Sequence, residues 1–134
     1  MSLYLTRTLA SSYEQAMDDL RIALLSHGFR LESEITVTSA QDRQLEIPYR
    51  IFAISTPRIQ FPRGRGPEPT AGIPMHIVVQ HDRNGAVMIS AMDPARVMLA
   101  AYGDSHQEEA EMARGLVLRL LNEMESCSRT LKVA

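Results

Sequence analysis

The fold is decided by residues 75–94, MHIVVQHDRNGAVMISAMDP, where two apolar runs flank a turn. The runs are Met75–His81 and Ala86–Met92, and the Asn-Gly dipeptide between them tolerates positive φ at both positions. This pattern predicts a β-hairpin. Asp93 and Pro94 then predict the start of a short helix, because Asp caps a helix N-terminus and Pro suits the first helical position.

A longer helix is predicted before the hairpin, over residues 12–27. Ser11 and Glu14 have the spacing of a capping box, in which the serine hydroxyl accepts a backbone hydrogen bond and the glutamate reaches back to the serine amide. Gly28 follows, where glycine most easily adopts the left-handed conformation that ends a helix. The apolar residues recur at spacings of three and four: Tyr13, Ala16, Met17, Leu20 and Leu24.

A third helix is predicted near the C-terminal end. The short helix that starts at Asp93 is expected to end near Gly103, and Ser105 with Glu108 has the spacing of a second capping box. One face then carries an apolar stripe: Ala110, Ala113, Val117, Leu120, Leu121 and Met124. The tail over residues 127–134 is expected to fray.

Three more strands are predicted, over Leu3–Leu9, Phe29–Val37 and Tyr49–Ser55. Residues 56–74 hold so much proline and glycine that they predict a long loop. The order is strand, helix, four strands, short helix and long helix. It predicts an α+β fold, β-α-β4-α, whose antiparallel sheet is covered on one face by two main helices. Strands 49–55 and 75–81 are apolar on both sides, which indicates a second covered face, as in a dimer.

The composition fits one small domain. The chain has 134 residues, a formal net charge of −2 and one cysteine, so we expect a single domain over 1–134 with its core at about 3–126. One cysteine excludes an internal disulfide and a multi-thiolate metal site, and the near-neutral charge argues against a dedicated nucleic-acid-binding protein. Neither a membrane-length apolar run nor a signal-peptide pattern is present, so we expect a cytoplasmic protein without a membrane partner.

Five segments together carry a family resemblance: Ser12–Ala16, Gly28-Phe29, Pro48–Ile51, Ile77–Val79 and Asp93-Pro94. In their order and spacing they resemble the bacterial and archaeal domain of unknown function family 302, over about residues 5–125. The resemblance implies a β-α-β4-α arrangement similar to the TATA-binding-protein-like fold, and it implies a homodimer. It does not imply DNA binding, because a fold does not fix a function.

The chain departs from the pattern of that family at two positions. Ser55 and Met75, within 55–57 and 74–76, stand where the family pattern carries cysteines. The resemblance therefore implies a protein that works without any thiol chemistry of its relatives.

The histidines do not predict a metal site. His76 and His81 are five residues apart on one predicted strand, so their side chains point to opposite faces. His27 and His106 fall at predicted helix ends, and a metal site needs three or four converging ligands. We therefore expect neither a metal nor another cofactor.

A candidate ligand site lies where predicted strands end beside the loop 56–74. Its residues are Tyr49, Arg50, Arg58, His76 and Asp93. Arg50 and Arg58 suit an anion, while His76 and Asp93 can orient a polar group. The competing interpretation is structural, with Asp93 as an N-cap and Arg50 paired with Glu32 or Glu34 across the sheet.

The function expected from these patterns is a dimeric small-ligand-binding or accessory module with an anion-friendly cleft beside the loop 56–74. One alternative is an enzyme that uses Asp93 or His76 as an acid or base on an anionic substrate. Another is weak nucleic-acid binding through the basic segment: Arg43, Arg50, Arg58, Arg63 and Arg65.

Overall fold

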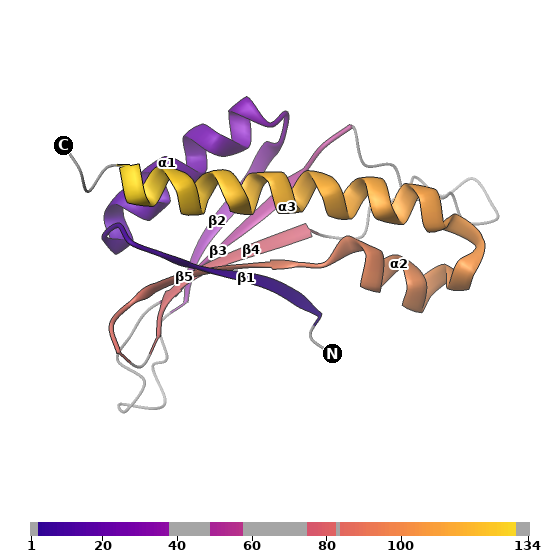
Figure 1. Cartoon of the computed structure of the whole chain (residues 1–134), viewed down its shortest axis with the longest axis horizontal. Coiled ribbons are helices and arrows are strands. Elements are labelled where there is room, and N and C mark those ends of the chain that lie inside the picture. Colours follow the sequence, from indigo (N-terminus) through magenta and orange to yellow (C-terminus); the bar gives the residue numbers. More distant parts are fainter. Residues whose placement is uncertain (1–2, 38–48, 58–74, 83, 131–134) are drawn as a thin grey trace.

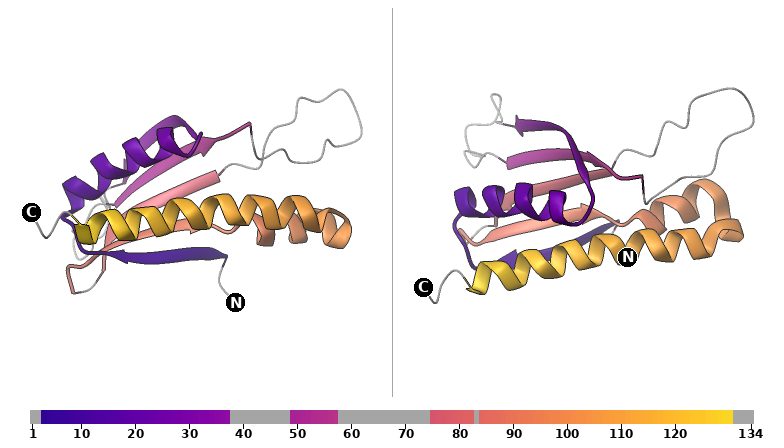
Figure 2. Two further views of the ribbon diagram at one scale, coloured as in Figure 1. Left: turned by 45° about the horizontal axis from the view of Figure 1, so that its top comes forward. Right: turned by 90° about the horizontal axis from the view of Figure 1, so that it is seen from above.

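The computed structural model describes residues 3–37, 49–57, 75–82 and 84–130. Its sheet has five antiparallel strands in the spatial order β1-β5-β4-β3-β2 (Figures 1 and 2). The strands are β1 (Tyr4–Leu9), β2 (Arg30–Val37), β3 (Tyr49–Ser55), β4 (Met75–His81) and β5 (Val87–Met92). The helices are α1 (Tyr13–Ser26), α2 (Pro94–Tyr102) and α3 (Gln107–Thr130), and a 3-10 turn, η1 (Gly103–His106), joins the last two.

Helices α1 and α3 lie on the same face of the sheet, while α2 and the N-terminal part of α3 extend past its end (Figure 1). This arrangement confirms the predicted α+β fold, β-α-β4-α, with one face of the sheet under two main helices. The predicted strands agree with the observed ones to within a residue at each end. In β3, β4 and β5 the apolar alternation matches the burial, whereas in β2 the register shifts between Leu31 and Ser33 and Ile35 is exposed.

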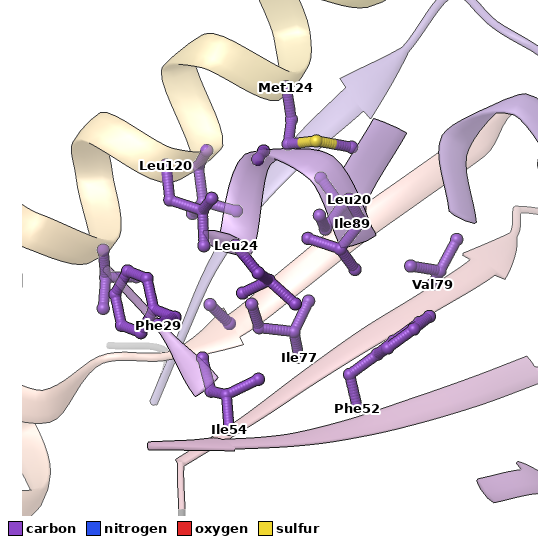
Figure 3. Close-up of a cluster of buried hydrophobic side chains, with 14 of the residues drawn as sticks. Leu20, Leu24, Phe29, Phe52, Ile54, Ile77, Val79, Ile89, Leu120 and Met124 are labelled. Carbon is purple, nitrogen blue, oxygen red and sulfur yellow. The ribbon is translucent and has the colours of Figure 1, made fainter. Parts of the chain in front are cut away.

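The core lies between that face of the sheet and the two helices (Figure 3). Leu20 from α1, Leu120 from α3 and Phe52 from β3 are all fully buried, and Ile77 and Ile89 join them from the central strands. Each such side chain stabilises the fold by about 1.5–3 kcal/mol relative to an exposed position. Packing of this kind orders the sheet edge and the helix ends from which the site is built.

The opposite face of the sheet has an uncharged central row. The strand register aligns five residues across all five strands, and none of them is fully buried: Thr6, Ser90, Val78, Ile51 and Ile35. Ile35 is 52% exposed. The covering helices α1 and α3 both lie on the other side (Figure 2), so within the described part of the chain this face has no layer above it.

Two predicted helix caps are wrong. Helix α1 is capped by Ser12 and not by Ser11, since the Ser12 hydroxyl accepts from the Gln15 amide at 3.1 Å. Ser105 does not cap α3, because it lies inside η1 and its hydroxyl donates to the carbonyl of Tyr102 at 2.8 Å. In both cases the spacing of residues in the sequence did not decide which residue caps the helix, because helix ends shift by a residue or two with the local backbone.

The C-terminal helix also continues past the point where fraying was predicted. Helix α3 runs through Thr130, and Ser128 is only 1% exposed. The Ser128 hydroxyl accepts a hydrogen bond from the Ala10 amide at 3.0 Å, which ties this end of the helix to the end of β1. The predicted frayed tail 127–134 is therefore wrong as far as residue 130, and residues 131–134 lie outside the described ones.

Candidate functional site

A pocket of about 520 Å³ lies between α2, η1 and α3, beside the start of β1. Helices α2 and α3 are joined by η1 and run back along each other (Figure 1), so the two form the long walls of the pocket. Its volume lies in the range of pockets that hold small molecules.

Asp93 stands at one end of this pocket and is almost completely buried, at 5% exposed. One carboxylate oxygen accepts from the Ala95 amide at 3.0 Å, which caps α2, and its own amide donates to the carbonyl of Leu3 at 2.7 Å. The other carboxylate oxygen accepts from Nε of Arg114 at 3.2 Å. A buried carboxylate requires such partners, because an unpaired buried charge is costly.

Arg114 comes from α3 and is held in place by Asp93. Its side chain is 41% exposed and lines the pocket, whereas that of Asp93 is 6% exposed. The bond to Asp93 uses one of the five N–H donors of the guanidinium group. Arg114 is therefore a cation fixed by a buried carboxylate at the wall of the pocket.

The rest of the wall is mixed. Met98 and Leu99 from α2 and Ala110 from α3 give an apolar middle, and Met98 is 1% exposed. At the end near η1 stands His106, whose ring meets that of Tyr102 edge to face at a centroid distance of 5.5 Å. The pocket thus has polar groups at both ends and an apolar stretch between them, and the charged side chains of Arg96 and Glu111 also line its wall.

The structure separates the residues that the sequence analysis grouped. Of the four that it describes, Asp93 alone lines this pocket, while Arg58 and the segment 58–74 lie outside the described residues. Tyr49 and Arg50 begin β3, whereas Asp93 follows the end of β5. Because β3 and β5 are each antiparallel to β4, the start of one and the end of the other lie at opposite ends of the sheet.

Arg50 takes part in a charge network with β2 and α1. Its Nη1 lies 3.4 Å from Oε1 of Glu34, and Arg21 donates to both oxygens of the same carboxylate, at 2.9 and 2.8 Å. The hydrogen bonds from Arg21, and to a lesser degree the charge of Arg50, hold the pKa of Glu34 below its ordinary value. The structural interpretation of Arg50, a pair across the sheet, is the one that the structure shows.

His76 and Asp93 do not form an acid–base pair. His76 pairs with Ala53 in the register, and alternation from the buried Ile77 places its side chain on the uncovered face of the sheet. Asp93 is buried on the other side of that layer, with both carboxylate oxygens engaged. The two side chains therefore do not meet at one site.

Five polar or charged residues of the pocket had no place in the candidate site drawn from the sequence: Arg96, His106, Gln107, Glu111 and Arg114. Arg114 carried a usable signal, because it follows Ala110 by four residues and precedes Val117 by three. Those spacings put a cation on the apolar stripe of its helix, where a lone charge needs a buried partner or a cavity.

The described residues hold neither a metal-binding cluster nor a membrane-spanning helix. Within the described ranges, no cluster of three or more His, Cys, Asp or Glu side chains is placed to hold a metal ion. None of the helices in the described part of the chain has the length and apolar character to cross a bilayer.

Comparisons with known proteins agree with the fold. The family model described as "Domain of unknown function DUF302" matches residues 5–124. The crystal structure of an uncharacterized conserved DUF302 protein from Bacillus stearothermophilus is 18% identical, covers 96% of this chain and 99% of its own, and superposes with a TM-score of 0.69. No curated protein matches the chain. At that identity the solved structure supports the fold alone.

Proposed function

The chain belongs to the family described as domain of unknown function DUF302, and from that premise we propose that it is a dimeric small-ligand-binding module. The ligand is a small anionic molecule with an apolar part, and its site is the pocket between α2, η1 and α3. The family description assigns no activity, so the proposal rests on the geometry of this pocket.

The observation that carries the proposal is the ion pair between the buried Asp93 and the partly exposed Arg114, beside an open volume of about 520 Å³. A fixed guanidinium at the wall of a partly apolar pocket is an arrangement typical of anion recognition.

The test fills the pocket with one side chain. Ala110 is buried and lines the pocket, so Ala110→Phe places a ring in the space proposed for the ligand. Ala100→Phe on the exposed side of α2 is the matched control, because it adds the same ring outside the pocket. We expect small organic acids to raise the Tm of the natural protein and of the control, and to leave the Tm of Ala110→Phe unchanged.

Two results would count against a ligand site in this pocket. One is a set of organic acids that stabilises neither the natural protein nor the Ala100→Phe control. The other is an equal rise in Tm for all three proteins, which would place the binding elsewhere on the molecule.

The second copy in the proposed dimer sits on the uncovered face of the sheet. The central row of that face carries no charge, so two copies can meet there without opposing like charges, and Val78 and Ile51 lie at its middle. The free thiol of Cys127 suits a reducing compartment, and the proposal therefore keeps the cytoplasm as the place where the protein acts.

A further inference from the structure

We infer that the pocket between α2, η1 and α3 takes an aliphatic carboxylic acid of medium length that carries a second polar group at its far end. This inference rests on the proposed function and names the chemical class of its ligand. It follows from the order of the groups along the pocket: a fixed arginine, an apolar stretch, and a histidine beside a glutamine.

The carboxylate belongs at Arg114. Asp93 binds the Nε edge of the guanidinium at 3.2 Å, and the side chain of Arg114 lines the pocket. A planar guanidinium pairs with a carboxylate through two parallel hydrogen bonds, which a lysine cannot reproduce. Asp93 already accepts from Ala95 and Arg114, so it is a positioning residue and does not itself meet the ligand.

The chain of the acid belongs along the apolar middle. Met98 and Leu99 face Ala110 across the groove, and Leu99 is 48% exposed although it lines the pocket. Arg114 and Gln107 are seven residues apart on α3, which corresponds to about 10 Å along the helix axis. An extended carbon chain advances about 1.25 Å per C–C bond, so eight carbon atoms span about 9 Å, close to that length.

The far end of the acid belongs at His106 and Gln107, which line the end of the pocket near η1. An imidazole and a side-chain amide both offer N–H donors to a second polar group. Glu111 also lines the pocket, between the two ends along α3. The carboxylate of Glu111 repels an acidic ligand, so removing this charge should strengthen the binding of an acid. The same change would weaken the binding of a ligand that carries an amine.

The experiment titrates three probes of equal length, octanol, octanoate and octanedioate, into the full-length protein at low salt and follows backbone amide shifts by NMR. We expect octanoate to bind about tenfold more tightly than octanol, because it adds a charge-assisted pair with Arg114. We expect octanedioate to bind a further severalfold more tightly, through His106 and Gln107.

Variants assign each end of the ligand. Arg114→Gln should remove the advantage of octanoate over octanol, and His106→Ala should remove only the advantage of octanedioate over octanoate. Glu111→Gln should strengthen both acids by a few-fold. Because Arg114→Gln leaves Asp93 buried without its partner and can fail to fold, Arg114→Lys is the second variant; it keeps the charge but loses the fork, and it should weaken octanoate several-fold.

Each contrary result has its own meaning. Octanol binding as tightly as octanoate would overturn the carboxylate end, and octanoate binding as tightly as octanedioate would overturn the second polar end. If none of the three probes binds while other organic acids still stabilise the natural protein but not Ala110→Phe, this ligand class is wrong and the proposed function stands. If no acid distinguishes those two proteins, the proposed function fails and this inference fails with it.

Discussion

Glu34 joins two arginines from different elements. Its carboxylate accepts two hydrogen bonds from Arg21 on α1 and lies 3.4 Å from Arg50 on β3. The Arg21 bonds lower its pKa first of all. A carboxyl group whose pKa is lowered by folding adds stability above its unfolded pKa of about 4.3, and this stability is lost as the pH falls through the lower, folded pKa.

We therefore expect Glu34→Gln to lower the free energy of unfolding by about 0.5–1 kcal/mol at neutral pH, a modest value because the groups are partly exposed. Urea unfolding between about pH 7 and pH 3 measures it, and the difference from the natural protein should shrink toward the acidic end. Glu32→Gln is the control on the same strand, since Glu32 accepts a hydrogen bond from a neutral group, the Ser55 hydroxyl, at 2.6 Å. A loss for Glu34→Gln that is the same at every pH would contradict the arginine network.

The thiol of Cys127 lies near a buried carboxylate. Burial raises the pKa of this thiol, and the neighbouring Asp19, which is 9% exposed, raises it further. The thiolate is the species that reacts with alkylating agents, so we expect slow reaction of the native protein with iodoacetamide near neutral pH.

Asp19→Asn should increase the rate of Cys127 alkylation by a few-fold at about pH 8, because it removes a negative charge that disfavours the thiolate. Mass spectrometry of timed samples measures this rate. Asp18→Asn is the matched control on the same helix, since the side chain of Asp18 is 68% exposed. Equal rates for the two variants would show that burial alone protects the thiol.

Helix α3 is fixed at its C-terminal end by one hydroxyl group. Ser128 accepts from the Ala10 amide at 3.0 Å and donates to the carbonyl of Glu125 at 2.7 Å. We expect Ser128→Ala to lower the free energy of unfolding by about 1–2 kcal/mol, because the Ala10 amide would lose its partner in a partly buried place.

Denaturant unfolding of Ser128→Ala gives that loss as a shift of the midpoint. Thr130→Ala is the control two residues later, where an exposed hydroxyl donates within its own helix, to the carbonyl of Ser126 at 3.1 Å. We expect this control to stay within about 0.5 kcal/mol of the natural protein. A Ser128→Ala loss no larger than that of the control would mean that this hydrogen bond adds nothing measurable to the stability of the fold.

The elements of the fold were predictable because their signals are local. The Asn-Gly turn, Asp93 before Pro94 and the apolar alternation along the strands each act within a few residues. The cap of α1 was not predictable, because Ser11 with Glu14 and Ser12 with Gln15 both have the spacing of a capping box. The end of α3 was predicted to fray because Ser128 is a polar residue near the C-terminal end. Its partner, the Ala10 amide, comes close to it only in the folded chain.

The candidate site depends on tertiary structure and was predicted only at Asp93. The sequence analysis grouped residues that lie near the ends of predicted strands. In the antiparallel sheet, however, Arg50 at the start of β3 and Asp93 after the end of β5 lie at opposite ends of the sheet. The pocket itself arises where α2 and α3 pass the end of the sheet (Figure 1). The signal for the pocket in the sequence is the position of Arg114 on an apolar stripe.

At the scale of the whole molecule, the uncovered face of the sheet is the surface on which we expect a second copy to bind. Val78 stands in the middle of the uncharged row, with Ser90 on one side and Ile51 on the other. If a second copy covers this row, a charge at its centre would be buried without a partner in the dimer and solvated in the monomer, so the charge would favour dissociation.

We therefore expect light scattering to give the natural protein twice the chain mass of 15.0 kDa, and Val78→Lys the mass of one chain. Ile22→Lys is the matched control, because Ile22 is 68% exposed on α1, on the side of the covering helices, and that variant should remain a dimer. Circular dichroism of both variants verifies that the fold is intact. A natural protein of 15.0 kDa would refute the dimer. A dimer that Ile22→Lys breaks and Val78→Lys does not would place the interface away from the uncharged row of the sheet.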